Sequence, residues 1–457
     1  MKFMKLALLG TAALAAVSVS ARADDLADLK AQIEALKADV ANLQAAPAVP
    51  AGYSLMTVGE APAIVVPSLD VDKNFGATAT NIGVLPTADM PASTNIQWSG
   101  YARAALVYSD TSWKYSAGLT ALEGLAAATN SSALPEDSDD LDVYARGQLK
   151  VVGTTDTAVG EVGALVQLRG NYDGRGDAGV IMNEAWGWWK MTPEMTLGGG
   201  YTGTLSDIDY GYDGACNCYY TDNAAVALNP GDTTQMRLSY ASGPMSFAVA
   251  LEDATQTVTR TSPWSNSAAV RIAGDGLGAA GEIKYSGDSF SAEISGGWWD
   301  TSGDSLQQAA PAVLALVSSS DSYQVGIGAS ANLGDMLTLS AAAGMGQNAL
   351  DQDYWKASIL ASANLSDAVH AEVAFGYADW DQGATNAALE TAAYGGTTTA
   401  ALAGIYYDPV SQLTIGLEGE WMRDTFTDMD VTYALSGAGE KATRTSLSVD
   451  LVTVFRF

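Results

Sequence analysis

From residue 96 onward, apolar and polar side chains alternate along long runs of the chain. In the run 142–151, every second residue is Val, Ala, Gly or Leu, and the residues between them are Asp, Tyr, Arg, Gln and Lys. A period of two places the apolar residues on one face of a β-strand and the polar residues on the other. The longer runs match the roughly 9–11 residues of a tilted membrane strand, and strands of soluble sandwiches are typically shorter. Because closed barrels are the only sheets that satisfy every backbone group in lipid, the pattern predicts a transmembrane β-barrel.

A count of these runs predicts how many strands the barrel has. The predicted strands cover residues 96–108, 141–152, 160–170, 181–191, 194–203, 233–241, 244–253, 266–285, 289–299, 322–331, 336–346, 354–363, 368–379, 397–407, 412–423 and 443–457. Longer loops and short turns join them alternately, so we expect an all-β, 16-stranded antiparallel barrel over 96–457, with both termini on the periplasmic side. The range 266–285 is one strand only if Gly274, Asp275 and Gly276 form a bulge, because a turn there would give an odd number of strands.

The first 95 residues have a different character. Residues 1–23 are typical of a secretory signal peptide: Lys2 and Lys5 precede the short apolar run 6–19, and Ala21-Arg22-Ala23 fits a cleavage site. Residues 45–95 contain many prolines among Ala, Val and Thr, which predicts an extended tether.

Between these segments, residues 24–44 predict a short helix. Its apolar positions, three and four residues apart in turn, are Leu26, Leu29, Ile33, Leu36, Val40 and Leu43. This a/d pattern favours a self-associating periplasmic coiled coil, because no neighbouring helix is predicted to receive the stripe. The alternative is an amphipathic helix that packs on its own domain.

Charge and composition exclude several function classes. The chain has 52 acidic and 22 basic residues and a formal net charge of −30. Such a charge, without a basic patch, excludes nucleic-acid binding. A single histidine, His370, and the absence of a cysteine cluster disfavour a zinc site or a histidine-based triad. We therefore expect no catalysis, no metal site and no cofactor, and we expect His370 to be a polar residue of the barrel interior.

The chain resembles the porins of alphaproteobacterial outer membranes. The features that carry the resemblance are the signal, the coiled-coil sequence DLADLKAQIEALKADVANLQ, the Pro/Ala tether, the first strand IQWSGYARAALVY and the last strand LVTVFRF. The resemblance implies a homotrimeric general diffusion pore of a Gram-negative bacterium whose third loop, here 204–232, folds inward. The aromatic residues Phe455 and Phe457 resemble the signal that the barrel-assembly machinery reads. Cys216 and Cys218 are not a feature of the resemblance, and both a disulfide and free thiols stay open for them.

Charged residues suggest where such a pore is narrowest. The basic residues near the middles of predicted inward faces are Arg103, Arg146, Arg237 and Arg271. Acids of the predicted inward loop are Asp207, Asp209 and Asp213. If this loop enters the aqueous lumen, its acids and a basic wall would create a transverse field at the constriction. The alternative is that these are solvated residues without a special role.

Together these patterns predict an outer-membrane channel, surrounded by lipid, for passive diffusion of ions and small hydrophilic solutes. The acidic loops favour a modest cation preference because they raise the local cation concentration, although the basic wall acts in the opposite direction. A substrate-specific channel of the same fold, for a sugar or another small solute, is the alternative.

Overall fold

The computed structural model describes residues 56–69, 74–84, 94–116, 136–172, 179–212, 218–221, 225–258, 270–301, 321–349, 351–381, 395–427 and 441–457. All of these belong to one compact unit of the chain. The predicted signal peptide, 1–23, and the predicted coiled-coil helix, 24–44, lie outside the described residues. Within the described part, no helix is long and apolar enough to cross a membrane.

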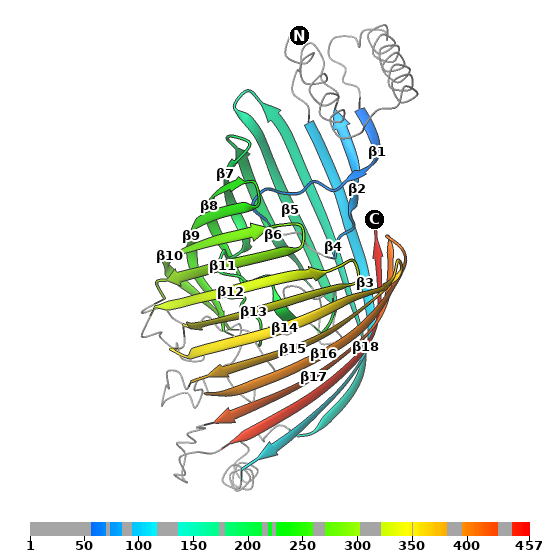
Figure 1. Cartoon of the computed structure of the whole chain (residues 1–457), viewed down its shortest axis with the longest axis vertical. Helices are drawn as coiled ribbons and strands as arrows, with labels where there is room; N and C mark the ends of the chain where they lie inside the picture. Colours follow the sequence, from blue (N-terminus) through cyan, green and yellow to red (C-terminus); the bar gives the residue numbers. More distant parts are fainter. Residues whose placement is uncertain are drawn as a thin grey trace. The chain divides into compact units, whose positions relative to one another are not determined.

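The described residues form 18 strands (Figure 1). Their bounds are β1 Met56–Pro62, β2 Thr78–Val84, β3 Thr94–Tyr115, β4 Ser138–Thr157, β5 Gly160–Tyr172, β6 Val180–Lys190, β7 Met195–Gly203, β8 Asp232–Ser242, β9 Met245–Val258, β10 Val270–Ser286, β11 Phe290–Trp299, β12 Ser322–Leu333, β13 Leu337–Gln347, β14 Asp353–Ser366, β15 Val369–Trp380, β16 Gly395–Val410, β17 Leu413–Thr427 and β18 Ala442–Arg456. Each strand from β3 to β18 pairs antiparallel with the next, and β18 pairs with β3. Strands β3 to β18 therefore form a closed 16-stranded antiparallel barrel, which confirms the predicted fold.

The barrel closes where the last strand meets the first. The β18–β3 register runs from Ala442↔Tyr115 to Arg456↔Tyr101. At the end of this seam, the N–H groups of Gly100 and Phe457 each donate to the other residue's carbonyl oxygen at 3.0 Å. A Cβ on Gly100 would lie 2.4 Å from the Phe457 ring, so the glycine leaves the space that this terminal ring occupies.

The strand expected over 266–285 is a single element with a bulge. Its pairing with β9 shifts register between Ala273 and Leu277, which span the predicted Gly274-Asp275-Gly276 bulge. The extra residues leave β10 continuous, so the strand count stays even, as an antiparallel barrel with both chain ends on one side requires.

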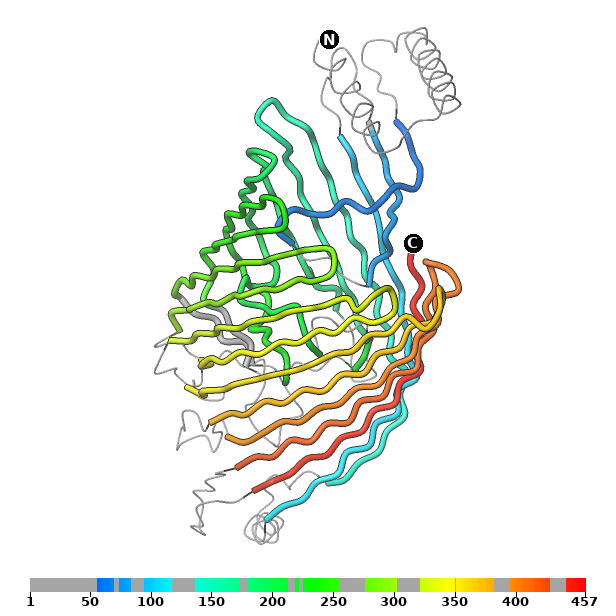
Figure 2. Tube along the Cα trace, in the orientation of Figure 1, coloured from blue at the N-terminus to red at the C-terminus, as the bar shows by residue number. Residues whose placement is uncertain are grey.

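Two strands lie inside the span 45–95 that the sequence assigned to a tether. β1 pairs with β2 along its whole length, and β2 pairs with the start of β3 at residues 94–98. This start of β3 projects past the end of β18, so its edge is available to β2. The connection from β1 to β2 leaves the sheet, and its blue trace crosses the barrel toward β7 and β8 (Figure 2).

The alternation of side chains gives the barrel two different faces. On β9, for example, Val249 and Leu251 are 61% and 62% exposed on the outer face, whereas Ala248 and Ala250, which alternate with them, are buried inside. The same alternation on β5 exposes Val166 and Leu168 and buries Gln167. An apolar outer face with polar residues on the inner face is the pattern of a barrel that stands in lipid.

Candidate functional site

The connection between β7 and β8, residues 204–231, is called the inward loop, because its described residues, 204–212, 218–221 and 225–231, lie inside the barrel. Five apolar residues of its described parts are at most 3% exposed: Leu205, Ile208, Tyr212, Val226 and Leu228. Their neighbours on the inner wall include Ala250, Ala280, Ala342, Leu360, Ala374 and Leu402. A loop on the outer rim could not bury its side chains against these inward-facing residues.

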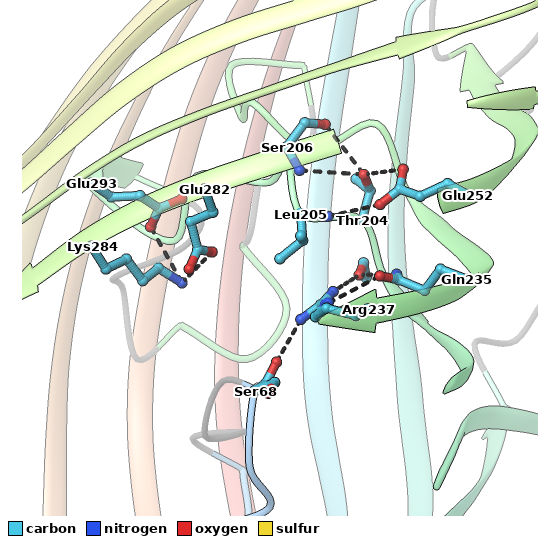
Figure 3. Close-up of polar contacts among 11 residues, drawn as sticks. Ser68, Thr204, Leu205, Ser206, Gln235, Arg237, Glu252, Glu282, Lys284 and Glu293 are labelled. Atoms are coloured by element: carbon cyan, nitrogen blue, oxygen red, sulfur yellow. Dashed lines mark hydrogen bonds and ion pairs between the residues drawn. The ribbon is translucent and has the colours of Figure 1, made fainter. Parts of the chain in front are cut away.

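Buried polar side chains of the wall bind the backbone of the inward loop. Glu252 on β9 accepts hydrogen bonds from the Thr204 hydroxyl (2.7 Å) and the Leu205 N–H (3.1 Å), as Figure 3 shows. Gln324 on β12 donates to the carbonyl oxygens of Ser206 (2.7 Å) and Leu228 (3.1 Å). Further contacts are Gly211 N–H to Ser340 Oγ, Tyr212 N–H to Ser358 Oγ, and Lys356 Nζ to the Ala227 carbonyl oxygen. Because an unpaired buried polar group costs about 1–3 kcal/mol, these groups hold the loop in place.

The far end of the loop is held by one carboxylate, that of Glu418 on β17. It accepts hydrogen bonds from the Tyr219 N–H (2.7 Å), the Tyr220 N–H (3.0 Å) and the Thr221 hydroxyl (3.1 Å). Glu418 is 1% exposed, so water cannot replace these bonds. The loop therefore spans the lumen from the β7–β9 side to the β17 side.

Small residues on the inner wall make room for the loop. A Cβ on Gly328 would lie 2.4 Å from Cδ2 of Tyr210, and a Cβ on Gly376 would lie 2.5 Å from Cγ2 of Val226. Both distances are far inside van der Waals contact, so any larger residue at these positions would displace the loop.

Three arginines lie close together on β3, β4 and β5, two to four strands around the barrel from the Glu418 anchor on β17. Arg103 on β3 is the direct register partner of Arg146 on β4, and Arg169 lies beside them on β5. The Arg103 guanidinium lies 4.4 Å from the ring centroid of Tyr220 and 6.0 Å from that of Tyr219. Arg146 donates to Asn171 Oδ1 at 2.6 Å. The structure thus brings Arg103 and Arg146 together beside residues 219–220 of the inward loop.

The other two arginines of the predicted basic wall stand apart from this cluster. Arg237 on β8 is buried, and it donates to Gln235 Oε1 (3.0 Å) and to the carbonyl oxygens of Gly203 (3.0 Å) and Ser68 (2.5 Å; Figure 3). Its guanidinium lies 5.3 Å from the centroid of the Trp186 ring. This set of contacts makes Arg237 an anchor for two backbone segments. Arg271 lies on β10, opposite Thr257, and its side chain is outside the described part.

The acids expected on the loop are only partly described. Asp207 and Asp209 are half-buried in the first part of the inward loop, and Asp213 lies outside the described residues. The loop residues over which the Arg103 guanidinium lies are Tyr219 and Tyr220. Burial raises the pKa of both hydroxyls, so these rings stay neutral at physiological pH. The anchoring carboxylates Glu252 and Glu418, which the sequence reasoning missed, come from the strands, where alternation marks them as inward-facing but does not show what they bind.

The remaining candidate residues occupy separate places. Cys218 is buried and disulfide-bonded, and Cys216 lies outside the described residues. His370 Nδ1 lies 3.0 Å from Asp408 Oδ2 beside the β14–β15 turn, and its ring stacks on Tyr406. Phe455 and Phe457 are exposed. In the part of the chain that the structure describes, no three His, Cys, Asp or Glu residues gather as a metal site would require.

Comparisons with known proteins bear on the fold. No family model and no curated protein matches the sequence. Among solved structures, the outer membrane channel DcaP of Acinetobacter baumannii matches with a TM-score of 0.53 and 14% identity, over 79% of this chain and 97% of that chain. An anion-selective porin from Comamonas acidovorans gives 0.49 at 12% identity, over 80% and 100% of the two chains. A mutant of the Rh. blastica porin gives 0.42 at 16%, over 79% and 100%. At these identities the likeness to DcaP establishes the barrel fold alone.

Proposed function

We propose that the chain forms a water-filled channel in the outer membrane of a Gram-negative bacterium, through which ions and small hydrophilic solutes diffuse passively, with no catalytic step. The observation that carries the proposal is the closed barrel of β3–β18, apolar outside and polar inside, with an inward loop that narrows its interior. Barrels of this many strands enclose an aqueous channel. The fold is that of DcaP, which is an outer membrane channel.

The proposal includes orientation and assembly. The short turns and the Phe457 end would face the periplasm, with residues 1–23 removed on export and the coiled coil of residues 24–44 on the same side. Phe455 and Phe457 would be read by the assembly machinery. The heptad pattern and the porin resemblance support a homotrimer, which native mass spectrometry in detergent tests directly: a population of monomers and dimers alone would contradict it.

We further propose a modest cation preference and a transverse field. The net charge of −30 supports the first, because acids around the channel mouths concentrate cations. The adjacent Arg103 and Arg146 support the second, because they place positive charge on one side of the lumen. The loop acids Asp207, Asp209 and Asp213 would supply the opposing charge.

A substrate-specific channel is a second candidate, favoured by the aromatic rings around the arginine cluster. Ring centroids of Phe75 and Tyr101 are 5.3 Å apart, and those of Tyr144 and Tyr220 are 6.1 Å apart. Aromatic faces beside hydrogen-bonding groups suit a small solute that has both apolar and polar surfaces, such as a sugar.

Planar-bilayer recording of the purified protein in a KCl gradient tests the proposal. We expect discrete conductance steps, a current that rises linearly with salt concentration, and a reversal potential displaced toward cations. An absence of conductance would overturn the channel itself, and a displacement toward anions would overturn the cation preference. A current that millimolar sugar blocks saturably would favour the substrate-specific channel over general diffusion.

A further inference from the structure

We propose that the connection between β1 and β2 is a second narrowing element, which forms part of the channel wall and sets the size limit together with the inward loop. We call its described residues, 63–69 and 74–77, the lumenal segment. The inference rests on the proposed channel function. It assigns a pore-lining role to a stretch whose sequence predicts only a tether.

The first half of the lumenal segment covers an apolar patch on the inner wall. Val152 on β4, Leu165 on β5, and Trp186 and Trp188 on β6 face inward and are at most 4% exposed. Val66 is buried among them, and Ile64 and Leu69 pack against the same cluster. A water-filled lumen would not retain so large an apolar surface uncovered. The patch is therefore the surface on which the lumenal segment packs.

Hydrogen bonds fix both ends of this half. Gln97 on β3 donates to the Pro62 carbonyl oxygen (2.9 Å) and accepts from the Ile64 N–H (2.6 Å). Arg237 on β8 donates to the Ser68 carbonyl oxygen (2.5 Å), as Figure 3 shows. Since β3 and β8 are five strands apart in the barrel, the segment runs between these contacts along the inner wall, over β4, β5 and β6.

The second half reaches the same arginines as the inward loop. Asn74 Oδ1 accepts from Arg103 (3.2 Å), and the Asn74 carbonyl oxygen accepts from Arg456 (3.0 Å). Arg103 lies over Tyr220 of the inward loop, and Arg456 donates to the Tyr219 hydroxyl (2.7 Å). The loop from one end of the barrel and the segment from the other thus meet at Arg103 and Arg456. The narrowest passage is bounded by both.

A charge placed on the lumenal segment tests whether ions pass beside it. We expect Asn74→Asp to displace the reversal potential in a KCl gradient further toward cations, because the new carboxylate would lie in the ion path next to Arg103. Asn332→Asp, the same substitution at an exposed position beside the β12–β13 turn, is the matched control and should leave the reversal potential unchanged. Equal reversal potentials for wild type and Asn74→Asp would overturn the inference.

A second variant tests the size limit. The full chain with residues 63–77 replaced by a flexible Gly/Ser linker keeps β1, β2 and the barrel but removes the segment. We expect higher single-channel conductance and faster swelling of proteoliposomes in large oligosaccharides. If the wild type conducts and this variant matches it, the inference fails while the channel stands. If the wild type does not conduct, the channel and the inference fail together. If the linker variant does not fold, Asn74→Asp decides alone.

Discussion

Arg456 Nη2 donates a hydrogen bond to the hydroxyl of Tyr219 across 2.7 Å and so ties the penultimate residue of the chain to the inward loop. The same guanidinium donates to the Asn74 carbonyl oxygen (3.0 Å) and to Thr414 Oγ1 (2.8 Å). One side chain at the closing seam of the barrel therefore contacts both elements that narrow the lumen. Correct closure of β18 on β3 and correct narrowing of the channel are coupled through this residue.

Replacing Arg456 with Gln should separate these two roles. The backbone pairing of Phe457 with Gly100 does not depend on the side chain, so the barrel should still close. Hydrogen bonds to a charged group contribute about 1.5–3 kcal/mol each, and the partial exposure of Arg456 places the loss near the lower value. We expect a lower urea midpoint and larger fluctuations of the open-channel current. Arg423→Gln, at an exposed position on β17, is the control. Quiet channels of unchanged stability in Arg456→Gln would contradict the coupling.

Glu418→Ala should release the far end of the inward loop. The substitution leaves the buried N–H groups of Tyr219 and Tyr220 without their acceptor, at a cost of about 1–3 kcal/mol each. We expect reduced thermal stability and a changed conductance in bilayers. Glu418→Gln keeps one acceptor oxygen and should lie between wild type and Glu418→Ala. Wild-type stability and conductance in Glu418→Ala would show that the loop does not depend on these bonds.

Arg146→Gln should displace the reversal potential toward cations. Its guanidinium is only half-buried and adjoins Arg103, so the change removes positive charge that ions in the lumen experience within the ~10 Å Debye length. The barrel should remain stable, because Arg146 faces water and not lipid. Arg423→Gln removes the same charge from an exposed position on the outer face of β17 and should have a much smaller effect on the reversal potential. Equal effects from the two variants would place Arg146 outside the ion path.

The sequence predicts the strands well because their alternation reports a local fact, namely which side chains face lipid. The bulge in β10 is also visible, since only a bulge keeps the strand count even. β1 and β2 are not predicted: both are short, lie among prolines, and owe their pairing to the projecting start of β3. No pattern in residues 45–95 indicates that the start of β3 has an unpaired edge to which β2 can pair.

For the residues inside the barrel, the alternation along each strand identifies which side chains face inward but not which groups they contact. Arg103 and Arg146 are neighbours because of the β3–β4 register, which the strand boundaries imply. Arg237 has the same mid-strand position, yet it binds Ser68 and Gly203, and nothing near Arg237 in the sequence marks Ser68 as a partner. Glu418 likewise contacts Tyr219 over 199 residues of separation. Such contacts depend on how a loop of about 28 residues crosses the lumen, which hydrophobic periodicity does not encode.

The loop acids make a prediction of opposite sign to that for Arg146. Replacing Asp207 and Asp209 together with Asn removes two negative charges from the inward loop and should displace the reversal potential toward anions. Asp288→Asn with Asp335→Asn, two exposed acids in short turns, is a control with the same change in net charge. If both double variants displace the potential equally, then the overall charge of the protein, and not the loop, sets the selectivity.

Gly376→Val should displace the inward loop from the inner wall, and a second substitution in the loop should restore its packing. Val226 is 1% exposed against β15, and a Cβ on Gly376 would meet its Cγ2, Cβ and Cγ1 atoms at 2.5, 2.7 and 3.0 Å. Overpacking of this kind typically costs about 1–3 kcal/mol. We therefore expect a lower thermal midpoint and altered conductance. Gly147→Val, at a position with no atom within 4 Å, is the control. Val226→Gly removes the clashing Cβ and both methyl groups, so Gly376→Val with Val226→Gly should recover much of the loss. Because the two residues are in contact, the double-mutant cycle should give a coupling energy of about 0.5–3 kcal/mol. Strictly additive effects would mean that Val226 does not pack on β15 in the membrane, and the loop would then have to occupy another part of the lumen.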